Sequence, residues 1–298
     1  MKTRILFILI AFFSFGCSRN ENNIGMSENP LIIGLSKSYF EKLSNEDISF
    51  LEKYISQQIG LIAKIDKVDE SAVLIEKIGS GKIDAALLTL NEYFIARQDY
   101  KAEPILQVVR GKDEKKYYAG IAVSSKNKDI KSFEDLKGKK IGARSPYSMS
   151  GFVLPSLFFL NAKLKPEFVF TGSHEESIKR LYKGELDAVS VYRKMIDSDK
   201  NLKLIQPMGP IPNEPWICRK NLKKEYCDRI KTAIKSFPEL KEGKIILSKM
   251  ADISYFDEVD HQDYKEIYDI IYNMGKDIYS LVPDGVNLKK INEPYYFD

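Results

Sequence analysis

The sequence predicts an α/β protein of two lobes built to one plan, each a mostly parallel sheet flanked by helices. Two pairs of similar segments predict this plan. Residues 75–88 align without gaps to residues 178–191, and each copy indicates a helix end, a glycine and a buried strand. Residues 32–36 and 140–145 form the other pair, each a strand running into a turn; the two pairs are offset by 103 and 108 residues. Alternating strands and helices favour parallel sheets, whose ligands lie beyond the carboxyl ends of the strands.

The first residues indicate export. A basic start is followed by an apolar run of 11 residues over positions 5–15, which is too short to span a bilayer as a helix. We therefore expect a signal peptide over residues 1–16. A small residue followed by Cys17 resembles a bacterial lipobox, in which the cysteine is lipidated and becomes the new N-terminus. Simple secretion is the alternative, because Ser14 and Phe15 depart from the usual lipobox residues.

The rest of the chain divides into four expected parts. In chain order these are a flexible tether, lobe one, lobe two, and a return to lobe one with C-terminal helices, at residues 17–29, 30–118, 119–208 and 209–298. Tyr117-Tyr118 and residues 206–215 would cross between the lobes as a two-strand hinge. Prolines favour an extended, stiff second crossing, and closure of such a hinge around a ligand is a standard motion.

Local signals predict helices between the strands. Ser44 and Asp47 indicate a capped start, and Gly60 can end that helix. Residues 132–138 predict a short capped helix, and residues 173–183 predict one that the following glycine ends. Apolar residues at helical spacing predict a core-facing helix near the C-terminus: Tyr264, Ile267, Tyr268, Ile271 and Met274.

Charge and cysteine content exclude several functions. The formal charge is +4, and it falls to +2 without Lys2 and Arg4, so nothing favours nucleic acid as a partner. No Cys/His cluster has metal spacing, and we expect neither a metal nor a cofactor. Cys218 and Cys227 lie nine residues apart across a predicted strand-to-helix turn. Export would permit a disulfide but geometry could forbid it, so the pairing stays open.

Residues 145–151, Ser-Pro-Tyr-Ser-Met-Ser-Gly, are the first candidate site. This serine turn follows a predicted strand and precedes an apolar helix over residues 152–160. Free N–H groups at the helix start, together with the hydroxyls, favour an anion. Taken alone, the segment also fits an ordinary turn capped by Ser150. Pro155 predicts a small kink or a later helix start.

A second candidate lies at residues 170–177, where a strand ends and Ser173 caps the next helix. His174 is one of only two histidines in the chain. Neighbouring parallel strands would bring this turn beside the serine turn, so His174 could donate to the same oxyanion. A solvated histidine is the alternative. Arg144 could add positive charge beside the serine turn or could simply be exposed at a strand end.

These motifs resemble those of a known family. They are Asp-Leu-Lys-Gly-Lys at residues 135–139, the serine turn at 148–151 with Pro155, and Gly-Ser-His at 172–174. The chain resembles the phosphonate, phosphite and phosphate family of ABC-transporter substrate-binding lipoproteins, which has the type II periplasmic binding fold. The resemblance covers nearly all of residues 30–240.

The resemblance implies a ligand-binding set from both lobes: Ser145, Ser148, Met149, Ser150, Gly151, His174, Tyr93, Tyr39, Tyr117 and Tyr192. The serines, His174 and the backbone at 149–151 would hold a phosphorus oxyanion. Met149 replaces a threonine of the family and removes one hydroxyl donor. Tyr192 stands where members that take an aminoalkyl phosphonate place an acidic residue, which argues against an amine-bearing ligand.

The resemblance therefore implies an extracytoplasmic, lipid-anchored monomer that binds a small oxyanion and delivers it to an ABC permease. The alternatives are a sensor as partner, or a ligand without phosphorus such as a sulfonate or a pyrimidine-like precursor. We do not expect an enzyme. Ser148 or Ser150 with His174 is the sole candidate nucleophile–base pair, and the chain lacks a Gly-x-Ser-x-Gly elbow.

Overall fold

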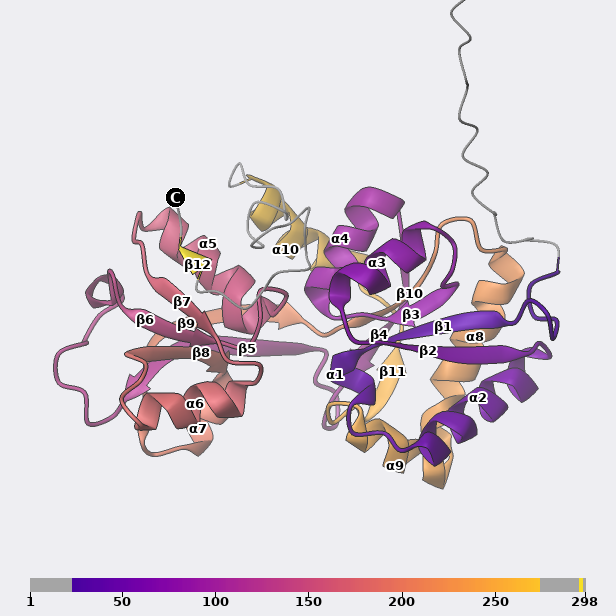
Figure 1. The fold of residues 1–298 in the computed structure, drawn as a ribbon, viewed down its shortest axis with the longest axis horizontal. Helices are drawn as coiled ribbons and strands as arrows, with labels where there is room; N and C mark the ends of the chain where they lie inside the picture. The colour runs from indigo at the N-terminus through magenta and orange to yellow at the C-terminus, as the bar shows by residue number, and fades with distance from the viewer. Residues whose placement is uncertain (1–22, 274–294, 297–298) are drawn as a thin grey trace, which may run out of the picture.

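The computed structural model describes residues 23–273 and 295–296, which form two lobes side by side (Figure 1). Lobe one contains six strands: β1 (Leu31–Ser36), β2 (Ala63–Val68), β3 (Ala85–Leu87), β4 (Glu103–Val109), β10 (Pro215–Cys218) and β11 (Tyr255–Asp257). Lobe two contains the other six: β5 (Lys116–Ser124), β6 (Lys140–Ala143), β7 (Glu167–Phe170), β8 (Ala188–Tyr192), β9 (Leu202–Pro212) and β12 (Tyr295–Tyr296). The sheet orders are β11-β4-β10-β3-β1-β2 and β12-β7-β6-β8-β5-β9.

Helices cover the sheets. Those that precede β5 or follow β10 are α1 (Lys37–Phe40), α2 (Asn45–Ile59), α3 (Ser71–Gly79), α4 (Leu90–Tyr100), α8 (Lys224–Ser236), α9 (Lys241–Lys249) and α10 (His261–Asn273). Lobe two adds α5 (Leu154–Asn161), α6 (His174–Tyr182) and α7 (Arg193–Ser198). Short turns are η2 (Glu134–Leu136), η3 (Met149–Val153) and η4 (Phe237–Glu239). No helix among the residues described is long and apolar enough to cross a membrane.

Capping explains where the predicted helices begin and end. Ser44 Oγ accepts a hydrogen bond from Asp47 N, the Asp47 carboxylate accepts one from Ser44 N, and left-handed Gly60 ends α2. Ser173 Oγ caps α6, because it accepts a hydrogen bond from Glu176 N at 3.0 Å. Both predicted helices are confirmed. The short helix predicted at residues 132–138 is only the single 3₁₀ turn η2.

The two-lobed α/β fold is confirmed, but the sheets are mixed rather than mostly parallel. In each lobe only three neighbouring strands run parallel, β2-β1-β3 in one and β7-β6-β8 in the other. β10 and β5 pair antiparallel with both of their neighbours. The reason is that each of these strands enters directly from the other lobe, without the helical crossover that would make it parallel.

The internal repeat corresponds to one contact made in both lobes. Asp84 Oδ2 accepts a hydrogen bond from Ile32 N at 2.8 Å, and Asp187 Oδ2 accepts one from Lys140 N at 2.8 Å. The aspartate before β3 thereby bonds to the start of β1, and the aspartate before β8 bonds to the start of β6. The repeated Gly-x-x-Asp-Ala pattern therefore has a structural role, because it sets the register of the parallel strands.

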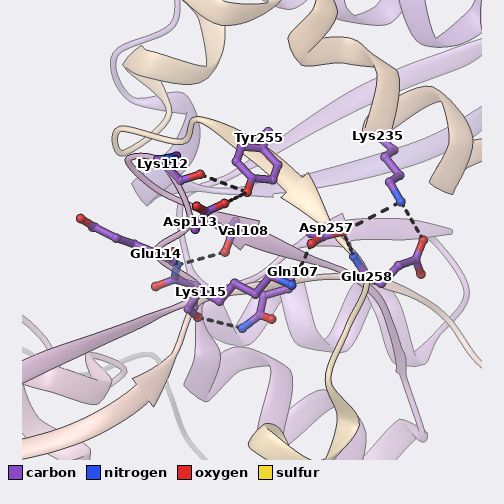
Figure 2. Close-up of polar contacts among 11 residues, drawn as sticks. Gln107, Val108, Lys112, Asp113, Glu114, Lys115, Lys235, Tyr255, Asp257 and Glu258 are labelled. Carbon is purple, nitrogen blue, oxygen red and sulfur yellow. Dashed lines mark hydrogen bonds and ion pairs between the residues drawn. The ribbon is translucent and has the colours of Figure 1, made fainter.

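Two short segments connect the lobes, residues 110–115 between β4 and β5 and residues 213–214 between β9 and β10. Asn213 joins them, since its N–H donates to Lys115 O at 2.9 Å and its Nδ2 donates to Val108 O at 3.0 Å. Figure 2 shows that the Tyr255 hydroxyl of β11 also donates to Lys112 O. The first connection is therefore held against lobe one.

The first crossing lies earlier than the sequence predicted. Tyr117 and Tyr118 are part of β5, which belongs to the second sheet, and Tyr117 pairs with Ile211 of β9. The reason is that the ladder between β5 and β9 already begins at Lys116, so the chain has entered lobe two before Tyr117.

The chain ends also differ from the expected parts. Ile24 is buried in the lobe one core and Ile62 N donates to Gly25 O at 2.8 Å, so residues 23–29 pack on lobe one instead of forming a flexible tether. The predicted signal peptide, Cys17 and the rest of the tether lie outside the described residues. At the other end, β12 pairs with β7 and joins the second sheet, not lobe one.

The cysteine pair and the C-terminal apolar stripe have defined places in the fold. Cys218 and Cys227 form a disulfide that links β10 to α8, with 6.2 Å between their Cα atoms. The helix predicted from the stripe is α10, in which Tyr264 and Ile267 are buried. Met274 lies outside the described residues.

Candidate functional site

A cavity of about 540 Å³ lies between the lobes, beyond the carboxyl ends of their parallel strands. Lobe one lines it with the turn after β1 and with the first turns of α3 and α4, and lobe two lines it with the serine turn and the end of β8. Arg110 and Glu214, from the two connections, also line it. Both lobes and the two connections between them therefore line one cavity.

The serine turn continues into η3, a short stretch of π-helix that precedes α5. Ser148, rather than Ser150, caps it, because Ser148 Oγ accepts a hydrogen bond from Gly151 N at 3.0 Å. The Gly151 N–H is thus used within the turn, while the N–H groups of Met149 and Ser150 precede the first intrahelical bond. α5 begins only at Leu154, which is the later start that Pro155 predicted.

Ser150 and His174 meet as the sequence predicted. Ser150 Oγ lies 3.4 Å from His174 Nε2, and Ser190 of β8 donates to Ser150 O at 2.8 Å. The structure leaves only 1% of Ser150 and 4% of His174 exposed, which excludes the alternative of a solvated His174. Ser150 lines the cavity, whereas His174 contacts Ser150 without being part of the cavity wall. His174 therefore acts on the cavity through Ser150.

The His174 side chain is neutral at pH 7. Burial, helped by the positive charge of Arg144, lowers the pKa of His174 to about 4. The cause is that a charged imidazole would lose its hydration beside another cation. A neutral imidazole still has one N–H donor. His174 can thus orient the Ser150 hydroxyl without adding a positive charge to the site.

Three of the predicted tyrosines line the cavity. Tyr117 and Tyr192 pack edge to face at 5.2 Å, and the Tyr192 ring also packs on His174 at 4.7 Å. The Tyr39 hydroxyl donates to Leu88 O at 3.3 Å. Burial raises the pKa of all three hydroxyl groups, so they stay protonated and remain donors at neutral pH.

Tyr93 does not face the ligand cavity. It is fully buried, its hydroxyl accepts a hydrogen bond from Arg97 Nη1 at 2.7 Å, and its ring packs on Tyr264 at 5.3 Å. Consecutive residues of a helix point about 100° apart. The preceding residue, Glu92, consequently lines the cavity together with Thr89.

Ser145 and Met149 line the cavity as the sequence predicted, and so does Tyr147, which it missed. The Tyr147 hydroxyl is buried and has no hydrogen-bond partner among the residues described. Burial raises its pKa. The serine turn thus presents an unpaired hydroxyl from a residue that lines the cavity.

Arg144, at the end of β6, lines the cavity and bridges the lobes. Its Nη2 donates to Ser38 Oγ of α1 at 2.7 Å. The other cavity arginine, Arg110, is paired with Glu214 at 2.9 Å. No local signal in the sequence predicts this pair, although Glu214 lies within the proline-rich crossing, because only the fold brings the two crossings together. Between residues 23 and 273 and at 295–296, no group of acidic, His or Cys side chains is arranged to hold a metal.

A comparison with known families identifies the kind of protein that carries this cavity. Residues 34–264 match the model of the family described as "ABC transporter, phosphonate, periplasmic substrate-binding protein". The chain belongs to this family. The match spans more than half of the chain and confirms the resemblance inferred from the motifs. Members of this phosphonate-binding family act outside the cytoplasm, as substrate-binding components of transporters rather than as enzymes.

Individual relatives agree with the family assignment. Phosphate-import protein PhnD of Mycolicibacterium smegmatis is 24% identical over 264 residues, which cover 77% of this chain and 82% of the relative. PhnD1 from Prochlorococcus marinus in complex with methylphosphonate has a TM-score of 0.67 at 19% identity, covering 83% of this chain and 98% of that one. XAC2383 from Xanthomonas citri bound to ATP has a TM-score of 0.70 at 16% identity, covering 82% and 98%. These structures show the type II periplasmic binding fold that the sequence predicted.

Proposed function

We propose that this phosphonate-binding-family member binds a small phosphorus oxyanion between its lobes and delivers it to an ABC permease. The observation that carries the proposal is the contact of Ser150 with His174 at the start of η3, on the wall of the cavity between the lobes. Hydroxyl groups, backbone N–H groups and a nearby arginine are the donors that hold oxyanions.

The named relatives favour phosphorus. The Mycolicibacterium smegmatis relative is a phosphate-import protein, the Prochlorococcus marinus structure holds methylphosphonate, and XAC2383 holds ATP, which also carries phosphate. In this chain the oxyanion would contact Ser145, Ser148, Ser150 and the backbone at Met149 and Ser150. Tyr39, Tyr117 and Tyr192 would enclose it, Gly151 would shape the turn, and His174 would orient Ser150.

Met149 does not rule out tight binding. Loss of one hydrogen bond to a charged group costs about 1.5–3 kcal/mol. The unpaired Tyr147 hydroxyl lines the same cavity and can supply a replacement donor. This chain would thus bind the oxyanion with the Tyr147 hydroxyl in place of the threonine hydroxyl that the family resemblance implies at position 149.

The proposal includes a membrane anchor and a monomeric state. A signal peptide over residues 1–16 and a lipidated Cys17 would hold the protein at the outer face of the membrane, where it can meet a permease. The protein would act as a monomer, because the two lobes of one chain already enclose the cavity. It would transfer its ligand unchanged.

A thermal-shift panel tests the ligand class. The panel contains phosphate, phosphite, methylphosphonate, aminoethylphosphonate and sulfate, each with the mature protein. A ligand at 100 times its dissociation constant adds about 2.7 kcal/mol to the free energy of unfolding. We expect at least one of the phosphorus compounds to give this shift. No shift with any of them, or a shift with sulfate alone, would contradict the proposal.

A further inference from the structure

Glu92 places a buried carboxylate on the wall of the proposed oxyanion cavity. It is 1% exposed and lies in the first turn of α4. Its Oε1 accepts a hydrogen bond from Ser71 Oγ at 2.5 Å, and its Oε2 accepts one from Thr89 N at 2.7 Å. An ionised carboxylate has about four acceptor sites. Glu92 can therefore accept a further hydrogen bond from a ligand in the cavity.

A carboxylate beside a bound oxyanion is repulsive unless a proton lies between them. Like charges brought together in a binding site repel each other, and when two acidic groups share a site, the pKa of one is strongly raised. A shared proton replaces this repulsion with a strong, charge-assisted hydrogen bond. Phosphate groups can take up such a proton at little cost near neutral pH, because their second pKa is about 6. Sulfate is fully ionised there and carries none.

We propose that Glu92 and the bound oxyanion share one proton, so that the cavity selects protonated phosphorus oxyanions over fully ionised anions. This inference rests on the proposed function and specifies the form of the ligand that the cavity takes. It also gives Glu92 a role beyond its hydrogen bond to Thr89 N, which an uncharged glutamine could make equally well.

The groups that interact with Glu92 do not themselves gain or lose a proton in the pH range of the test. Burial raises the pKa of Glu92, while the hydrogen bonds from Ser71 and Thr89 and the positive charge of Arg144 favour its ionised form. Tyr39 of α1 and Tyr147 of the serine turn also interact electrostatically with Glu92. Burial raises the pKa of both tyrosines, so they remain neutral over the pH range of the test. Any proton taken up or released on binding in that range therefore comes from Glu92 or from the oxyanion.

Calorimetric titration of the wild type and Glu92→Gln tests the inference. Methylphosphonate, phosphite, phosphate and sulfate are titrated from about pH 6.5 to about pH 9. For the wild type, we expect the affinity for the phosphorus oxyanion to fall about tenfold for each pH unit above the second pKa of that ligand. Sulfate should bind at least about a hundredfold more weakly at pH 7. In Glu92→Gln the pH dependence should flatten, and sulfate should bind within about tenfold of the phosphorus ligand.

Glu225→Gln is the matched control, because Glu225 occupies the first turn of α8 and does not line the cavity. It should behave as the wild type does. If Glu92→Gln does not fold, the pH profile and the sulfate affinity of the wild type are sufficient to test the inference. A flat pH profile with tight phosphorus binding, equal affinity for sulfate, or an unchanged ligand preference in Glu92→Gln would overturn the inference but leave the proposed function intact. If no phosphorus oxyanion binds the wild type, both fail.

Discussion

Ser150 Oγ lies 3.4 Å from His174 Nε2, although the two residues are 24 positions apart in the chain. They meet because the serine turn follows β6, Gly172-Ser173 follows β7, and these strands are parallel neighbours. Parallel strands bring their carboxyl ends to one edge of the sheet, where ligands of α/β proteins bind. The contact is the basis of the proposed oxyanion site.

His174 should make the protein less stable in acid. The unfolded histidine titrates near its ordinary pKa of about 6.5, while the folded one titrates at about 4. Between these values the unfolded state binds more protons, so the free energy of unfolding should fall by about 1.4 kcal/mol per pH unit as pH falls. Urea unfolding at a series of pH values from 7.5 to 4 measures this change in the free energy of unfolding. In His174→Asn this part of the loss should be absent; identical slopes in the two proteins would contradict the buried, neutral histidine.

Tyr147→Phe should weaken ligand binding without destabilising the fold. The hydroxyl is buried and has no partner among the described residues, so its removal costs no protein hydrogen bond. If it donates to the oxyanion, affinity should fall about tenfold or more. Calorimetric titration and thermal unfolding measure the two effects.

Tyr93→Phe is the matched control for that variant. Its hydroxyl is bonded to Arg97 and lies outside the cavity, so removal should cost about 1 kcal/mol of stability and leave affinity unchanged. If Tyr93→Phe lost affinity and Tyr147→Phe did not, the assignment of the two tyrosines would be wrong.

Arg144→Gln should reduce oxyanion affinity by about tenfold, with a larger loss at low salt. The guanidinium lines the cavity and donates to Ser38 of the opposite lobe. It therefore places a positive charge beside the position proposed for the anion. Salt screens part of such an interaction. Ser38→Ala removes the bridge but keeps the charge and should lose less affinity. Equal losses in the two variants would show that the bridge, and not the charge, matters.

Cys17→Ser should move the protein from the membrane fraction to the soluble extracytoplasmic fraction. A lipid chain on this cysteine is the anchor in the proposal, and its stable attachment needs more than one acyl group. Immunoblotting of separated fractions measures the shift, with Ser198→Ala, an exposed serine on α7, as the control. Retention of Cys17→Ser in the membrane would exclude the lipidated anchor.

Features that depend on neighbouring residues could be predicted from the sequence. Ser44 and Ser173 predicted helix starts because capping needs only nearby residues. The meeting of Ser150 with His174 was predictable because the strand order of an α/β repeat brings successive turns together. That Glu92 and not Tyr93 lines the cavity was not predictable, because it depends on how α4 is rotated against α10. The Arg110–Glu214 pair likewise needs both crossings in place.

The most direct measurement is the calorimetric titration of methylphosphonate, phosphite and phosphate into the wild type and Ser150→Ala. We expect at least one ligand to bind the wild type at a single site. Its affinity should fall about ten- to a hundredfold in Ser150→Ala, because one hydrogen bond to a charged group is lost. Ser198→Ala, an exposed serine on α7, should bind as the wild type does. Absence of binding by the wild type, or equal affinity in Ser150→Ala, would contradict an oxyanion site at the serine turn.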